Sequence, residues 1–210
     1  MDLKKELFIV AAFFALLTAV PTFAQTPQQD LLKSAFMKLA LNKDLDGAIA
    51  DCTAAIKIDP KYEAAYRARA NMQTQKGDYA AAVTDFTTLI GLSPNSVEYY
   101  GGRGDAYVKL GRPKQALADY DAALKLDPAG KGSASIYLNR GLVKSDAKDT
   151  EGAIADYSRA IAINPDYLYR AYEARAAAYR SLGKTALAEA DDKSAAAAKQ
   201  KTLDLVKGIK

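Results

Sequence analysis

A spacing of 34 residues recurs along this chain and constrains its fold more than any other feature of the sequence. Pro60, Pro94 and Pro128 keep that spacing, and Pro165 follows three residues late because residues 129–133 lengthen one turn. Alanines recur in step with these prolines at Ala48, Ala82, Ala116, Ala153 and Ala188. A repeat of this length is typical of supersecondary units that stack on one another. The chain is therefore expected to form a linear array rather than a single closed globule.

One copy of the pattern, residues 97–128, predicts two amphipathic helices joined by a tight turn. Gly111 can end the first helix in the left-handed conformation, and Pro113 suits the first turn of the second helix. The apolar face of the first helix is marked, at intervals of four and three residues, by Tyr100, Gly104 and Tyr107. A single hairpin of this kind cannot bury its apolar surface alone, so each copy requires a neighbour.

Two further columns, each a set of residues at equivalent positions in successive copies, support the alignment of the copies. The first-helix aromatic column contains Leu32, Tyr66, Tyr100, Tyr137 and Tyr172. The small-residue column contains Ala70, Gly104, Gly141 and Ala176, with Phe36 as the exception in the first unit. Lys43 and Lys148 stand where a turn glycine is expected, and Cys52 stands where an aromatic side chain is expected. In the last unit the polar Glu189 and Asp192 suit the solvent-facing surface of a terminal repeat.

This pattern resembles the tetratricopeptide repeat family from about Gln29 to Gln200. The resemblance implies an all-α fold, a right-handed α-solenoid of about five helix-turn-helix units. The units are expected at residues 29–62, 63–96, 97–130, 134–167 and 169–200. A short linker and first helix cap precede them at 25–28, and a C-terminal helix end or cap follows at 201–210. Because no stop signal lies between Gly183 and Gly208, the final helix is expected to be long, from about Thr185 to Lys207.

The first 24 residues differ in character from the repeats. Lys4 and Lys5 precede an apolar run from Leu7 to Val20, and a small-residue segment ends at Ala24. This order predicts a secretory signal peptide that is cleaved after Ala24 and exports the chain to the periplasm or the extracellular space. The run is short for a membrane span, which needs about 20 residues. The mature chain is therefore expected off the membrane, with an uncleaved anchor as the alternative.

Charge and composition argue against several functions. The formal net charge is only +4, and no concentrated basic face appears, so nucleic acid is not an expected partner. The chain has no histidine and one cysteine, so it lacks the usual general base and metal ligand and cannot form an internal disulfide. We expect no enzymatic activity, no cofactor and no metal. Cys52 is expected to be a buried core residue.

Acids and arginines recur in two columns that predict structural ion pairs. The second helices carry Asp51, Asp85, Asp119, Asp156 and Asp191. The first helices carry Arg69, Arg103, Arg140 and Arg175, with Ala35 in the first unit. Arg69 can meet Asp85 within its unit or Asp51 across the junction between units. The junction is favoured, because the first unit has no predecessor and lacks the arginine. Such pairs would fix the stacking register rather than add much stability.

In the family that the chain resembles, the first helices line the concave surface of a curved ribbon. The polar side chains of those helices that face away from the second helices are the candidate contacts for a peptide or protein: Lys33, Arg67, Asn71, Gln75, Asp105, Lys109, Asn139, Asp146, Arg170 and Arg180. Gly101 and Gly102 are unusual in a helix, where glycine costs about 1 kcal/mol relative to alanine. They either allow the backbone of a ligand to approach closely or reflect sequence drift that the fold tolerates, and sequence drift is the favoured interpretation.

The sequence therefore predicts an exported, non-catalytic interaction module that binds a peptide or protein segment on its concave face. The alternative is a structural adaptor or assembly factor in a cell-envelope complex. Such an adaptor would act through the C-terminal helix or through an oligomer edge. The sequence does not identify the partner.

Overall fold

The computed structural model describes residues 26–165 and 169–208, and there the chain forms helices and turns without a strand. The elements are α2 (Pro27–Met37), the π-helical turn η1 (Lys38–Asn42), α3 (Leu45–Ile58), α4 (Glu63–Lys76), α5 (Tyr79–Leu92), α6 (Val97–Lys109), α7 (Pro113–Leu126), α8 (Ser133–Asp146), α9 (Thr150–Ile163), α10 (Tyr169–Ser181) and α11 (Thr185–Gly208). The expected signal peptide, residues 1–24, lies outside the described residues. Among those that are described, no helix has the length and apolar character needed to cross a membrane.

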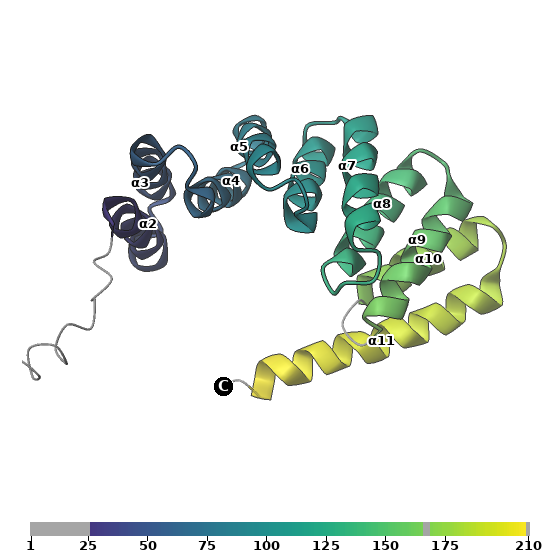
Figure 1. Cartoon of the computed structure of the whole chain (residues 1–210). Coiled ribbons are helices and arrows are strands. Elements are labelled where there is room, and N and C mark those ends of the chain that lie inside the picture. The colour runs from purple at the N-terminus through teal and green to yellow at the C-terminus, as the bar shows by residue number, and fades with distance from the viewer. Residues whose placement is uncertain (1–25, 166–168, 209–210) are drawn as a thin grey trace, which may run out of the picture.

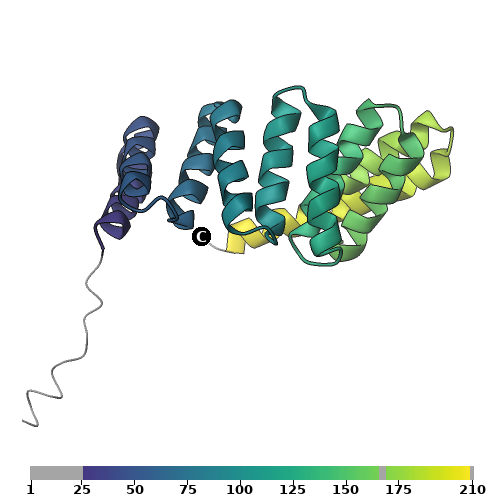
Figure 2. The same cartoon turned by 45° about the horizontal axis from the view of Figure 1, so that its top comes forward.

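Consecutive helices pack as hairpins, and the hairpins stack into a curved solenoid (Figure 1). Each hairpin packs against the next one through its second helix, as α3 does with α4 and α5 with α6. The first helices also meet one another on the inner side of the curve, where α6 contacts α8 and α8 contacts α10. A view from another direction shows the successive hairpins side by side along one axis (Figure 2). The predicted all-α solenoid is confirmed, and its first helices line the concave side.

Small residues on the first helices allow the tyrosines of the second helices to be buried. A Cβ atom at Gly104 would lie 2.7 Å from the ring of Tyr120, and a Cβ atom at Gly141 would lie 2.6 Å from the ring of Tyr157. Both tyrosines are almost completely buried. The close helix approach that the small-residue column predicts is therefore present, and it places bulky rings where the facing helix has no side chain.

The turns within the hairpins follow the expected chemistry. Asp44, Asp78 and Asp149 cap the second helices, and each side chain accepts a hydrogen bond from a backbone amide three residues later. Lys43 and Lys148 occupy the turn-glycine positions with positive φ angles of 52° and 66°. The turn geometry is therefore kept without glycine, at a cost of about 1–2 kcal/mol for each L-residue in the left-handed region.

The column assignment for the first helix is wrong by one residue. Ala35 is completely buried and takes the small-residue position, whereas Phe36 is 50% exposed. The turn η1 explains the difference, because a π-helical turn absorbs one extra residue within a helix. Upstream of η1, a residue of the first unit corresponds to the residue 35 positions later in the second unit. From Lys43 onward, the corresponding residue again lies 34 positions later. The apolar Leu32 and Phe36 therefore turn toward the concave side.

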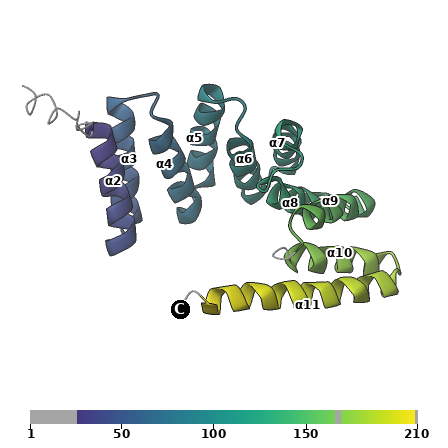
Figure 3. The same ribbon diagram turned by 60° about the horizontal axis from the view of Figure 1, so that its bottom comes forward.

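The last helix is long, as the missing stop signals predict. Helix α11 has 24 residues and packs against α10. Its C-terminal part continues past α10 along the open side of the curved array (Figures 1 and 3). Leu203 and Leu205, in this part of the helix, are 46% and 53% exposed.

Candidate binding groove

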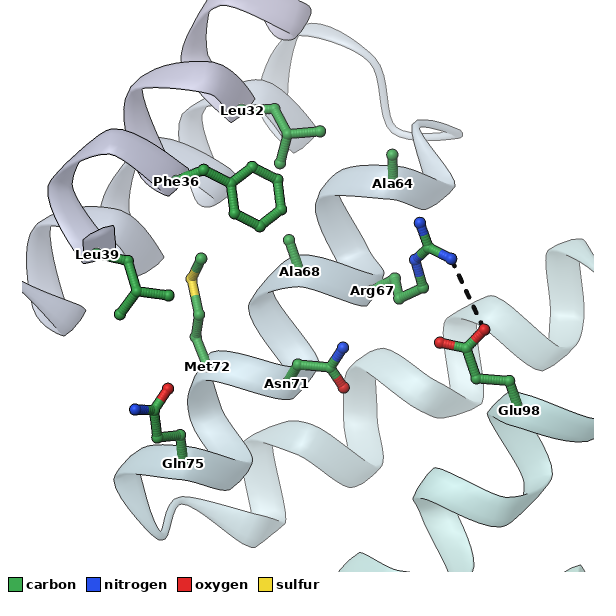
Figure 4. A pocket seen from close by; sticks show the side chains of 10 residues that line it. All are labelled: Leu32, Phe36, Leu39, Ala64, Arg67, Ala68, Asn71, Met72, Gln75 and Glu98. Carbon is green, nitrogen blue, oxygen red and sulfur yellow. Dashed lines mark ion pairs between the residues drawn. The ribbon is translucent and has the colours of Figure 1, made fainter. Parts of the chain in front are cut away.

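A pocket of about 310 Å³ opens on the concave side between α2 and α4 (Figure 4). One wall is apolar and consists of Leu32, Phe36, Leu39 and Met72. The polar side chains Arg67, Asn71 and Gln75 follow one another at intervals of four residues on α4, so they share one face of that helix. Figure 4 shows Arg67 reaching away from the apolar wall toward Glu98 of α6, at 3.7 Å.

A second pocket of about 480 Å³ lies between α6 and α8. Its lining includes Asp105, whose Oδ1 atom accepts hydrogen bonds from the Tyr120 hydroxyl at 2.6 Å and the Asn139 side-chain amide at 2.8 Å. Burial, reinforced by Asp105, raises the pKa of Tyr120, so its hydroxyl remains a donor at neutral pH. Glu98 lines both pockets. The two pockets therefore adjoin, and we call them together the groove.

The predicted contact residues divide into three groups: those in the first pocket, those in the second pocket and those outside the groove. Arg67, Asn71 and Gln75 line the first pocket, and Asp105 and Asn139 line the second. Helical spacing on α4 was sufficient to bring the first three together.

The remaining predicted contacts lie outside the groove. Lys33 lies on another side of α2, beside Met37 and Leu41, because the extra residue in the first unit rotates it away. Arg180 pairs with Asp192 of α11. The others are exposed and line neither pocket: Lys109, Asp146 and Arg170.

Sequence reasoning missed the groove residues Leu32, Phe36, Leu39 and Glu98. The three apolar residues were missed because the register of the first unit was misassigned. Glu98 carries a usable signal, since it precedes Asp105 by two helical turns and therefore lies on the same face of α6.

The predicted arginine and aspartate residues form ion pairs, but the favoured pairing across the junction is wrong. Arg69 donates to both carboxylate oxygens of Asp85 in its own unit, at 2.7 and 2.8 Å. The same two-pronged contact recurs in Arg103–Asp119, Arg140–Asp156 and Arg175–Asp191. Ala35 stands where the other units carry an arginine, which seemed to leave Asp51 without a partner inside its unit. The Asp51 carboxylate instead pairs with Lys38 and accepts a hydrogen bond from the Ser34 hydroxyl. The shifted register of the first helix supplies both partners.

Each arginine still reaches across the junction with its remaining nitrogen. The Nη1 atom of Arg69 donates to the Thr53 hydroxyl at 3.0 Å, and that of Arg103 donates to the Thr87 hydroxyl at 3.1 Å. Equivalent bonds join Arg140 to Asp121 and Arg175 to Ser158. One guanidinium thus connects three helices in two consecutive units. We call this series the arginine ladder, since a guanidinium bonds to both units at each of these junctions.

The reading of Gly102 as tolerated drift is also wrong. A Cβ atom at Gly102 would lie 2.5 Å from the ring of the buried Phe86, so any larger residue here would force that ring or the helix to shift. A Cβ atom at Gly101 would be 3.2 Å from Ile136, a tight contact that a small shift relieves. Both glycines line the second pocket, where they contribute no side chain.

Cys52 is buried, as its core column predicts. Burial raises the pKa of its thiol from 9.0 to about 11, although the positive charge of Arg69 opposes this shift. The thiol is therefore neutral and shielded at physiological pH. Among the residues that the structure describes, no three acidic, histidine or cysteine side chains are grouped so as to hold a metal ion.

The comparisons with known proteins agree with this architecture. The family model for the tetratricopeptide repeat matches residues 67–131 and 102–167. TTC0263, a thermophilic TPR protein of Thermus thermophilus, is 26% identical with a TM-score of 0.63, over 85% of this chain and 94% of that one. MamA is 24% identical with a TM-score of 0.71, over 80% of this chain and 95% of its own.

A third solved structure is of a protein described as having a peptide-binding site. YrrB, described as a TPR protein with an unusual peptide-binding site, is 18% identical with a TM-score of 0.63, over 84% of this chain and 90% of its own. No curated protein sequence matches the chain significantly. The family model, the stacked hairpins and these shared folds lead to one conclusion: the chain belongs to the tetratricopeptide repeat family, whose members are protein–protein interaction modules.

Proposed function

We propose that this chain is an exported, non-catalytic module that binds an extended peptide or protein segment in the groove. The observation that carries the proposal is the groove itself, which consists of two adjoining pockets on the first helices. Asn71, Gln75 and Arg67 are exposed there, and of these three only Arg67 has an ion pair, the 3.7 Å contact with Glu98. A concave site with an apolar wall and a few convergent polar groups is the usual form of a binding site. The peptide-binding site named for YrrB lies on a similar fold.

Export is supported by the order of charge, apolar run and small residues in the first 24 residues. The partner is therefore expected among proteins of the cell envelope or the extracellular space. The absence of histidine removes the most frequent catalytic base from the chain, which supports a non-catalytic role.

A pull-down from cell-envelope extract tests the groove. The full chain with a C-terminal affinity tag serves as bait beside the double variant Arg67→Glu, Asn71→Glu, which adds negative charge to the first pocket. The matched control is Arg159→Glu, an exposed charge reversal on the second helix α9. We expect the groove variant to lose the partner and the control to retain it. Equal recovery with both variants would contradict binding in the groove.

A second candidate, the envelope adaptor, is favoured by one observation. Leu203 and Leu205 are about half exposed on the part of α11 that extends past α10. The variant Leu203→Ser, Leu205→Ser in the same pull-down separates the two candidates. Loss of the partner in this variant alone would favour the adaptor, because the groove is unchanged in it.

A further inference from the structure

The two pockets of the groove differ in charge. The first pocket has an apolar wall, with Phe36 half exposed at its edge, and its lining includes one cation, Arg67. The second pocket is lined by three carboxylates and by no lysine or arginine. The carboxylates are Glu98, Asp105 and Asp127. A ligand that fills both pockets therefore meets an apolar surface and then a negative one.

The carboxylates of the second pocket retain unpaired acceptor atoms. Asp105 uses Oδ1 for both of its hydrogen bonds, and within the described part of the chain its Oδ2 accepts none. Asp127 accepts the backbone amides of Ala129 and Gly130 through Oδ1 alone. These bonds hold the side chains in place without neutralising their charge.

Glu98 is only weakly neutralised. Its one ion pair in the described residues is the contact with Arg67, at 3.7 Å, and both side chains are about half exposed. Exposed pairs of this kind contribute little, and salt screens them. A cationic group from a ligand can therefore approach the second pocket without displacing a strong internal partner.

The shape of the second pocket suits a long cationic side chain. Gly101 and Gly102 line it without side chains, and Ile136 adds an apolar side chain to the same lining as the carboxylates. Lysine and arginine have aliphatic stems that pack on such surfaces while the charged end reaches an acceptor. The first pocket, with Leu32, Phe36 and Met72, suits an apolar side chain.

We propose that the groove selects an extended peptide segment in which an apolar side chain fills the pocket between α2 and α4 and a nearby lysine or arginine enters the pocket between α6 and α8. This inference rests on the proposed function and adds the chemical class of the ligand. Charge complementarity selects the occupant, because the same three carboxylates would repel the phosphates of a nucleic acid and the acidic side chains of a peptide.

Selection from a phage-displayed library of random twelve-residue peptides on the immobilised full chain tests the inference. We expect enriched peptides that combine lysine or arginine with leucine, isoleucine, phenylalanine or methionine. In fluorescence anisotropy with the best peptide, the variant Glu98→Gln, Asp105→Asn should weaken binding by about two- to thirtyfold, the range expected for the loss of two exposed ion pairs. The variant Phe36→Ser should weaken it by about tenfold or more. Circular dichroism confirms that each variant is folded.

Matched controls make the result decisive. Glu151→Gln removes an exposed carboxylate from the second helix α9 and should leave binding unchanged. Replacing the peptide's basic residue by glutamine should remove the effect of the Glu98→Gln, Asp105→Asn variant. An oligolysine peptide without apolar residues should bind more weakly than the selected peptide, because it leaves the first pocket empty.

The outcomes separate this inference from the function on which it rests. Enriched peptides without a basic residue, or equal binding by the carboxylate variant, would overturn the ligand class while groove binding stands, provided Phe36→Ser still weakens it. If the peptides bind both variants as tightly as the wild-type chain, or if no peptide is enriched, both the ligand class and groove binding are overturned. Tight binding of oligolysine alone would show a purely cationic ligand and would also overturn the inference.

Discussion

The arginine ladder makes a quantitative prediction about stability. In the central unit, the side chains of Arg103 and Asp119 are 18% and 8% exposed and share two hydrogen bonds of 2.7 and 2.8 Å. The variant Arg103→Met removes both bonds and leaves the Asp119 carboxylate buried without a cation. Loss of one partner of a buried pair costs about 3–5 kcal/mol. Arg103 is partly exposed, so the lower end of that range, about 3 kcal/mol, is the expected loss.

The double variant Arg103→Met, Asp119→Leu should recover most of that loss, because it leaves no buried charge. Urea unfolding followed by circular dichroism measures both variants. With a slope of about 1–3 kcal/mol per molar urea, the single variant should lower the midpoint by about 1–3 M. Because Arg103 also bonds Thr87 of the preceding unit, amide hydrogen exchange should show the loss of protection concentrated in α5, α6 and α7.

The control for the ladder is the exposed pair between Lys76 and Asp46, whose side chains are 50% and 77% exposed. Lys76→Met should change the midpoint little, since water and salt already screen this pair. If Arg103→Met were as mild as this control, or if the double variant were as unstable as the single one, the ladder would not hold the units in register as we argue.

Four further predictions concern three single positions. Lys148→Gly should raise the free energy of unfolding by about 1 kcal/mol, since glycine adopts the positive φ of 66° without strain. Thermal unfolding measures this change, and an unchanged or lower melting temperature would refute this account. Gly102→Ala should destabilise the protein by about 1–3 kcal/mol, because its Cβ atom would overlap the Phe86 ring; urea unfolding that matches wild type would refute this packing. Cys52 should resist thiol reagents at pH 8 until the protein unfolds, and rapid labelling of the native chain would show that the thiol is accessible. Because folding raises the pKa of this thiol from 9.0 to about 11, its contribution to stability is fully present below pH 9 and falls as the pH rises from 9 to 11, which urea unfolding at several pH values would measure.

Local chemistry made much of this fold predictable from the sequence. Gly111 has the positive φ of 69° that its turn requires, and Asp78 and Asp149 cap the helices that follow them. The long final helix follows from the lack of a stop between Gly183 and Gly208. These features depend on residues within one or two turns of each other, so their side chains and backbone preferences are sufficient to predict them.

Part of the groove followed from the sequence in the same way, because helical spacing alone places Arg67, Asn71 and Gln75 on one face of α4. The apolar wall did not follow. A π-helical turn can absorb one residue at several places in a helix, and only the burial of Ala35 against the second helix shows where this one lies.

The partner of each arginine was also decided by the tertiary structure. The two repeating columns are equally regular for pairing within a unit and across a junction, so periodicity cannot distinguish Asp85 from Asp51 as the partner of Arg69. The packing of α4 against α5 places the Asp85 carboxylate within 2.8 Å of the Arg69 guanidinium. The sequence by itself thus determined the repeat, the helices and their ends, since these depend on neighbours along the chain. The tertiary structure alone decided the ion-pair partners and the groove lining, because these depend on distances between helices that no spacing in the sequence specifies.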